Sequence, residues 1–334
     1  MQINLIQDLK LELERDLNRL GCKTSNSDST HDLLIRWFDY KQCTIAPQPR
    51  QVEQSARFNE SRKNLSIHEN LALDSIVREL RNGDDVNGHL SKAILNADKP
   101  DLLMADWRIH HIHISNTKKC PTDFFFDRSD WLAFSIVNSV NVYFLDIYPH
   151  AEENVWPKDD LLKIVKESWP SLLAGREFEG RLEPEISISS AQRGDARRAG
   201  INVPAVIGGS IVFPLGGGIT AAGTPISVRN QADRIWNYLG QVRIYLAGHT
   251  EFGQQLADEL GCGLQDLSLR LKWIDGQIHF REEKSGKYLV LDPDVVRIGG
   301  AKVLRENGRW ERQKEGQFRW TLPESMLPSD EQNR

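Results

Sequence analysis

A change in the spacing of apolar residues near position 107 constrains the fold of this chain more than any other feature. Before it, apolar side chains recur every three or four residues, which is the period of an amphipathic helix. After it come short segments rich in β-branched and aromatic residues and bounded by polar turns, which is typical of strands. We therefore expect a helical amino-terminal unit followed by a sheet.

The helical unit is predicted to occupy residues 1–95. Three helices are expected, over residues 1–20, 31–40 and 69–82. Ser29 or Thr30 is a plausible cap for the second helix, because a hydroxyl there can accept a hydrogen bond from a free backbone N–H group. Pro47 and Pro49 exclude a regular helix between the second and the third. We expect a crossing loop there.

Residues 96–175 are predicted to form an antiparallel sheet with a helix laid on it. The segments "WRIHHIHIS", "WLAFSIVN" and "VNVYFLDIY" each have strand composition, and "NS" is a tight connection between the last two. The segment "PKDDLLKIVKESWPSLL" then predicts a helix that starts with a proline and two aspartates.

Residues 176–325 are predicted to form an α+β carboxy-terminal domain with antiparallel hairpins. A mobile, charged connector follows Gly175, and two short strands are expected around "GGS". A glycine-rich loop, Gly216–Gly223, leads into a helix, and Asp275-Gly276 and Ser285-Gly286 have the composition of hairpin turns. The fold class of the whole chain is therefore α+β.

Composition limits the class of protein. A chain of 334 residues exceeds one ordinary core, and 40% hydrophobic with 27% charged residues is typical of a globular protein. No apolar run approaches the roughly 18 residues that a spanning helix needs, so we expect a cytoplasmic protein without a membrane partner. The four cysteines form no CxxC pair, so neither a disulfide framework nor a zinc ribbon is indicated.

Three of the nine histidines fall within four positions, at His110, His111 and His113. In a strand, alternation sends His111 and His113 to the face of Ile109, and His110 to the opposite face together with Arg108. We expect the first pair to point toward His150, at the end of a neighbouring strand.

Three interpretations of these histidines stay open. They are structural groups that hydrogen-bond to neighbouring strands, or an acid–base pair that works without metal, or metal ligands. RNA cleavage through its own 2′-hydroxyl needs only the acid–base pair. A metal site would join His111 and His113 with Asp106 or Asp146, but the sequence contains no metal-binding signature at this point.

The run "WLAFSIVNSVNVYFLDIYPHAEENVW" resembles the core of the RelE/ParE-type toxins, and the likeness covers about residues 107–156. Those toxins are small ribonucleases or gyrase poisons with a helix and an antiparallel sheet. The resemblance implies that His150, at the strand end, is a catalytic or phosphate-facing residue. The chain departs from the family where an arginine run is usual in the first hairpin strand, and at Asp146.

Two functions follow as expectations. The first is a toxin-like ribonuclease or nuclease of a bacterial antiviral defence or toxin–antitoxin system, with His111, His113 and His150 as catalytic residues and no cofactor. The second is a non-catalytic subunit that binds protein or nucleic acid. The expected partners are RNA or another nucleic acid, and an antitoxin or defence-complex subunit. Four residues are candidates for contacting nucleic acid: Arg108, Arg193, Arg197 and Arg198.

The net charge of −5 argues against extensive wrapping of nucleic acid and leaves room for a local basic groove. The loop Gly216–Gly223 could cradle a phosphate at the amino terminus of the helix that follows. It lacks the Lys-Ser/Thr of a P-loop, and no βαβ unit frames it. We therefore expect a structural loop whose glycines adopt positive φ angles or allow close packing.

Overall fold

The structure is a computed structural model of the α+β class, with the predicted helical amino terminus. It describes residues 4–150, 159–178, 192, 194–196, 199–248, 254, 257–258, 262–274, 276–284, 286 and 288–289. The chain divides into two compact units, Met1–Leu34 with Ala232–Arg334, and Ile35–Gln231. The division falls inside helix α2 (Thr30–Cys43) and inside helix α8 (Ile226–Gly248).

The first unit joins the amino-terminal helix to a hairpin from the other end of the chain. Helix α1 (Leu5–Arg19) buries a stripe of leucines completely, as its periodicity predicts. It packs on strand β8 (Leu269–Ile274), which pairs with β9 (Gln277–Glu282). Strand β10 (Tyr288–Leu289) completes the predicted antiparallel meander, and a 3₁₀ turn, Leu264–Asp266, precedes it.

Helix α2 begins with a reciprocal pair of hydrogen bonds at Ser29. The Asp32 N–H donates to Ser29 Oγ at 3.1 Å, and the Ser29 N–H donates to Asp32 Oδ2 at 2.9 Å. Both residues thereby satisfy backbone donors that a helix start leaves without partners. Of the two predicted caps, Ser29 is the one that is used.

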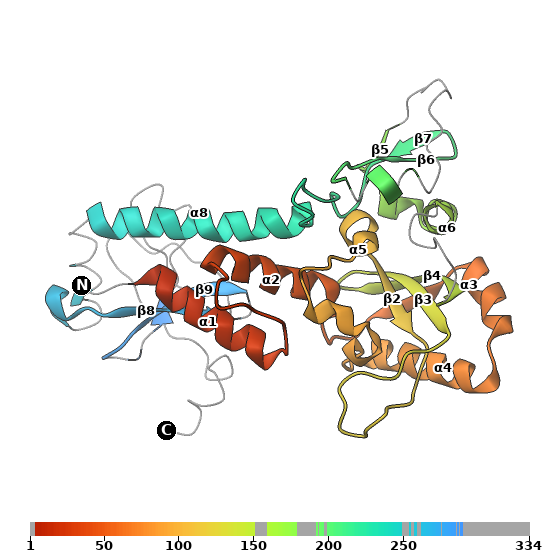
Figure 1. The fold of residues 1–334 in the computed structure, drawn as a ribbon, viewed down its shortest axis with the longest axis horizontal. Helices are drawn as coiled ribbons and strands as arrows, with labels where there is room; N and C mark the ends of the chain where they lie inside the picture. Colours follow the sequence, from red (N-terminus) through yellow and green to blue (C-terminus); the bar gives the residue numbers. More distant parts are fainter. Residues whose placement is uncertain are drawn as a thin grey trace. The chain divides into compact units, whose positions relative to one another are not determined.

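The second unit is built on a four-stranded sheet in the order β1-β4-β3-β2 (Figure 1). Strands β2 (Ile109–His113), β3 (Trp131–Val137) and β4 (Asn141–Pro149) form the predicted antiparallel meander. Strand β1 (Gln51–Gln54) adds to the edge of β4 in parallel. A β-bulge between Phe134 and Ser135 shifts the register of β3 against β4.

Helices cover both faces of this sheet. Helix α3 (Ala56–Ser61) and helix α4 (Ile67–Asn82) supply one core together with inward residues of all four strands or their ends. Helix α5 (Leu102–Trp107) and helix α6 (Asp160–Ser168) supply the core on the other face. Short 3₁₀ turns connect these elements, at Arg62–Asn64, Asn87–His89, Lys92–Leu95 and Pro170–Leu173.

A second, small sheet with the order β5-β7-β6 lies against the core of α6. Its strands are β5 (Glu177–Phe178), β6 (Ala205–Ile207) and β7 (Ser210–Val212). The predicted "GGS" hairpin is confirmed, because Gly208 and Gly209, both with positive φ, turn β6 into β7. No helix within the described ranges is both long and apolar enough to cross a membrane. The four cysteines, all in described positions, form no disulfide.

The two units differ from the three domains predicted at 1–95, 96–175 and 176–325. Leu73 and Ile76 of α4 share a core with Phe144 of β4, so no division follows residue 95. Likewise, Ala205 of β6 shares a core with Leu161 of α6. Periodicity identifies the buried stripe of a helix, but the partner that covers it is set by tertiary packing.

Three local predictions were incomplete. Strand β1 lies where the sequence predicts only a crossing loop, because its alternating polar side chains suit an edge strand. The charged connector after Gly175 contains β5. The first predicted strand starts later than "WRIHHIHIS" suggests, because Trp107 ends α5 and Arg108 has a left-handed backbone with φ 57°.

Candidate functional site

Strand β2 orients the histidines by simple alternation. It pairs with β3 so that His111 lies opposite Phe134 and His113 opposite Leu132. Phe134 and Leu132 belong to the core on the α6 face, whereas Ile112 belongs to the core on the α4 face. His111 and His113 therefore share the α6 face, at the end of the strand where the apolar core gives way to polar groups.

The bulge in the sheet decides which face His150 takes. Before the bulge, Tyr143 and Leu145 of β4 point to the α6 face, and after it Tyr148 packs there instead. Because His150 follows Tyr148 by two positions, it shares that face. Its N–H donates to the Asp130 carbonyl at 2.6 Å, which extends the ladder between β3 and β4 by one step.

We call His111, His113 and His150 the histidine row, because the ring of His113 neighbours both of the others. The ring centroids of His111 and His113 are 6.5 Å apart, and those of His113 and His150 are 5.4 Å apart with an angle of 27° between their planes. His150 is exposed, the His111 side chain is 17% exposed, and His113 is only 4% exposed. His150 thus lies at the surface, His113 is nearly buried, and His111 is partly covered.

Burial keeps His113 neutral. It is the main cause that lowers the pKa of this imidazole from 6.5 to about 4, and the charges of His111, His150 and Arg128 contribute to the same shift. The His113 Nδ1 atom is buried, and no described residue forms a hydrogen bond with it.

Asp101 supplies the carboxylate of the site. It is the cap of α5, where its Oδ1 accepts hydrogen bonds from the N–H groups of Leu103 and Met104. Its Oδ2 lies 3.3 Å from His111 Nδ1. Burial opposes ionisation of Asp101, but the hydrogen bond and charge of His111 hold its pKa below the ordinary value. The carboxylate is therefore ionised and orients the His111 ring.

His110 and Arg108 stand apart from this row. His110 is buried on the opposite face, and burial lowers its pKa to about 4, with Arg108 among the charges that add to the effect. Arg108 is partly buried at the turn between α5 and β2. The other arginines predicted to contact nucleic acid, Arg193, Arg197 and Arg198, lie outside the described residues.

The two aspartates proposed for a metal site are both buried, and the carboxylate of Asp146 is engaged elsewhere. The buried Asp146 accepts a hydrogen bond from Ser61 Oγ at 2.5 Å and pairs with Arg57 at 3.4 Å. Asp106 is buried at the end of α5, where its carbonyl accepts a hydrogen bond from the Gly216 N–H. In the part of the chain that the structure describes, no group of three or more histidine, cysteine or acidic residues could hold a metal ion.

The glycine-rich loop serves packing, as expected. Gly217 and Gly218 have φ angles of 89° and 84°, and a Cβ atom on Gly216 would lie 2.0 Å from the Ala105 carbonyl oxygen. The N–H groups of all three glycines donate to carbonyls of this chain, those of Asp106, Pro214 and Ala105. Donors already used in this way do not cradle a phosphate.

The sequence interpretation missed two contributors to the site. Asp101 precedes the predicted strand by several residues, and its only local signal is that of a helix cap. Arg128 ends a loop of lysines and phenylalanines, and its charge acts on His113. The signal that could have revealed this loop is the run "FFF" at 124–126 with two lysines shortly before it.

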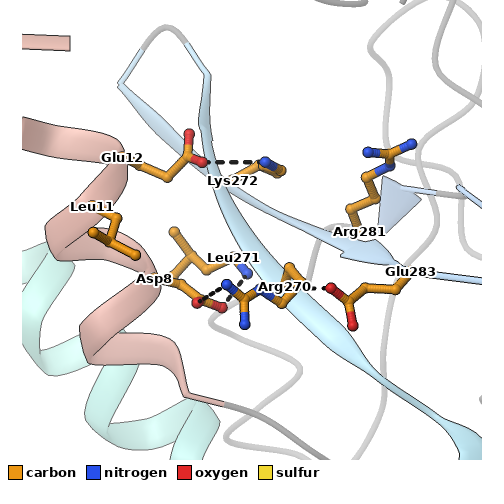
Figure 2. Close-up of a pocket in the computed structure, with 8 residues that line it drawn as sticks. All are labelled: Asp8, Leu11, Glu12, Arg270, Leu271, Lys272, Arg281 and Glu283. Carbon is orange, nitrogen blue, oxygen red and sulfur yellow. Dashed lines mark hydrogen bonds and ion pairs between the residues drawn. The ribbon is translucent and has the colours of Figure 1, made fainter. Parts of the chain in front are cut away.

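A polar pocket of about 320 Å³ lies between α1 and the β8–β9 hairpin of the first unit (Figure 2). Asp8 accepts a hydrogen bond from the Leu271 N–H at 3.1 Å and pairs with Arg270 at 3.1 Å. Glu12 pairs with Lys272 at 3.2 Å. Because its acidic and basic side chains pair with one another, this pocket is a weaker candidate for a site than the histidine row.

Comparisons with protein-family models, with curated proteins and with solved structures found no match to this chain. The resemblance of residues 107–156 to RelE/ParE-type toxins therefore stays a prediction.

Proposed function

We propose that this protein is a metal-independent, toxin-like endoribonuclease of a bacterial defence or toxin–antitoxin system, acting in the cytoplasm. The observation that carries the proposal is the row of His111, His113 and His150, in which the central ring has a buried nitrogen without a described hydrogen-bond partner. Burial disfavours the charged form of an imidazole, and titratable groups with perturbed pKa values gathered on one face are typical of functional sites.

We assign the two proton transfers of RNA cleavage to two neighbouring rings of the row. The neutral His113 accepts the proton of the 2′-hydroxyl, whose oxygen then attacks the adjacent phosphorus. His150, exposed and stacked on His113, donates a proton to the leaving 5′-oxygen. The products are a 2′,3′-cyclic phosphate and a free 5′-hydroxyl. At the end of the step the base, His113, has gained one proton and the acid, His150, has lost one.

The neighbouring groups stabilise the charge that develops on the phosphate. His111 is oriented by Asp101, and Arg128 is exposed beside the row. A cation next to a pentacoordinate phosphate favours its extra negative charge. Asp101, Arg128 and His111 are therefore assigned supporting roles around the pair His113 and His150.

A second candidate is a non-catalytic subunit with structural histidines. The outer face of the small sheet favours it: Phe178 and Val206 both lie opposite Ile211, and they are 59% and 52% exposed. Phe213, two positions after Ile211, is 47% exposed. Exposed apolar patches of this kind mark contacts with protein partners. An antitoxin or another defence-complex subunit would be such a partner.

The test is to incubate the purified protein with RNA, alone and with ribosomes, in the presence of EDTA. We expect cleavage to fall at least about 100-fold in His113→Ala/His150→Ala, which is the usual size of a lost acid–base contribution. His68→Ala is the control, because His68 is exposed on α4. Cleavage that survives the double substitution, or that needs added metal, would contradict the mechanism.

Growth after induced expression in a bacterial host gives a second readout. A toxin-like nuclease arrests growth, and the same double variant relieves the arrest. If the wild-type protein neither arrests growth nor cleaves RNA, while the variant only lowers the free energy of unfolding, the structural role of the histidines holds instead.

A further inference from the structure

The segment of residues 116–128 between β2 and β3 is held firmly beside the histidine row. The Phe126 N–H donates to the Gly88 carbonyl, and the Asp127 N–H donates to the Thr117 carbonyl, both at 2.9 Å. A Cβ atom on Gly88 would lie 2.7 Å from the Phe124 carbonyl oxygen, so the segment approaches the 3₁₀ turn Asn87–His89 as closely as a glycine allows.

Its three consecutive phenylalanines have different surroundings. Phe126 stacks on the ring of His89, with centroids 4.0 Å apart and planes 8° apart. Phe125 is buried, and Phe124 meets it edge to face at 5.0 Å. Phe124 itself is 51% exposed. Two of the rings thus anchor the segment, and the third is presented to solvent on a fixed support.

Cations accompany these rings. Lys118 Nζ lies 4.6 Å from the centroid of Phe126, and Lys92 Nζ lies 5.8 Å from that of Phe125. Lys119 and Arg128 are exposed at either end of the segment. Arg128 acts electrostatically on His113, and Asp130, two residues later, accepts the hydrogen bond of the His150 N–H. The carboxy-terminal end of the segment, at Arg128, is therefore near the proposed catalytic row.

We propose that this segment binds single-stranded RNA next to the cleavage site, with a base stacked on Phe124 and phosphates beside Lys118, Lys119 and Arg128. The inference rests on the proposed ribonuclease function and names its substrate class. An exposed aromatic ring stacks on an unpaired base of any sequence, whereas the bases of a duplex are already stacked and paired.

The charge balance of the segment limits how it binds. Residues 116–130 contain three aspartates beside Lys118, Lys119 and Arg128, and one of them, Asp123, accepts a hydrogen bond from the Cys120 N–H. Stacking must therefore carry much of the binding. With about three phosphate contacts, log K should fall with log salt at a slope of about −2 for a single strand.

The experiment measures binding of the full chain to a fluorescent, single-stranded 2′-O-methyl RNA oligonucleotide, which lacks the attacking hydroxyl and is not cleaved. Phe124→Ala should weaken binding about 5- to 150-fold, since one stacked base is worth about 1–3 kcal/mol. Ile67→Ala is the control, because Ile67 is 81% exposed on α4. A duplex of the same sequence should bind at least about tenfold more weakly.

Equal binding of Phe124→Ala and wild type, or equal binding of duplex and single strand, would overturn this inference. Its failure is distinct from that of the nuclease proposal. Binding that depends on Phe124 without any cleavage of ordinary RNA refutes the nuclease and retains the RNA platform. Cleavage with an unchanged kcat/KM in Phe124→Ala refutes the platform and retains the nuclease.

Discussion

The histidine row of the second unit and the polar pocket of the first differ in how their titratable side chains are paired. In the pocket, Asp8, Glu12 and Glu283 are matched by Arg270 and Lys272, and these pairs join residues more than 250 positions apart in the chain or on neighbouring strands. In the row, His111 lies beside the Asp101 carboxylate, and the ring of His113 has an imidazole on either side. The pocket thus pairs opposite charges across the chain, whereas titratable groups of one kind with perturbed pKa values mark a candidate functional site.

The largest effect is expected from breaking the pocket. Asp8 is 4% exposed, and Asp8→Ala leaves the Leu271 N–H without its acceptor. It also removes the 3.1 Å ion pair of Arg270, which keeps its pair with Glu283 at 3.8 Å. We expect the free energy of unfolding to fall by about 2–4 kcal/mol, which urea denaturation would measure.

Glu14→Ala on the same helix is the matched control. Glu14 forms only a helical pair with Lys10 at 3.8 Å, so its loss should cost no more than about 0.5 kcal/mol. Equal losses in the two variants would show that the pocket pairs contribute no more than surface charges do.

The next effect separates the two roles of Asp101. Asp101→Asn keeps a side-chain oxygen for the α5 cap but removes the charge beside His111. We expect cleavage to fall about 10- to 100-fold, or about 1.4–2.7 kcal/mol of transition-state stabilisation, with a melting temperature close to that of wild type. Asp101→Ala should lose both activity and about 1 kcal/mol of stability. Full activity in the asparagine variant would show that Asp101 acts only as the cap of α5.

The third prediction concerns acid pH. The pKa values of His110 and His113 fall from 6.5 to about 4 on folding, so between these limits the unfolded chain binds protons that the folded protein excludes. Stability from these residues is present above pH 6.5 and is lost as the pH falls toward 4. Each excess proton contributes a slope of about 1.4 kcal/mol per pH unit.

Asp39 opposes this trend. Burial and the charge of Asp101 raise the pKa of Asp39 from 3.8 to about 7, so its contribution is lost as the pH rises through 7. His110 and His113 against one carboxyl leave a net rise in stability of about 1.4 kcal/mol per unit between pH 4.5 and 6, and His89, whose pKa burial also lowers, adds to this rise. Urea denaturation at several pH values should show this rise, and a flatter one in His113→Gln. Identical slopes in both proteins would mean that His113 is not buried in its neutral form.

The smallest effect concerns the glycine loop that packs on α5, the helix that carries Asp101. Gly217→Ala should cost about 1 kcal/mol, because its φ of 89° disfavours any Cβ although the nearest atoms are 3.7 Å away. Gly240→Ala, within α8 and with no neighbour within 4 Å of a Cβ, should instead stabilise by about 0.5–1 kcal/mol. Opposite signs in thermal melts support a structural loop, and unchanged stability with lost nucleotide binding in Gly217→Ala would contradict it.

The predictions that succeeded from the sequence depend on short-range geometry. Alternation placed His111 and His113 on one face, the period of the leucines in α1 marked its buried stripe, and Gly208-Gly209 marked a hairpin. Each signal lies within a few residues, where backbone conformation alone sets which side chains are neighbours.

What the tertiary structure alone decided are the contacts that cross the chain. The extra residue of the β-bulge turns His150 to the face of His113, the α5 cap brings Asp101 to His111, and α1 meets a hairpin from the opposite end of the chain. The sequence by itself determined the helices, the meander and the faces of β2. It could not set register, bulge or helix partners, because these follow from the packing of whole surfaces whose members are far apart in sequence.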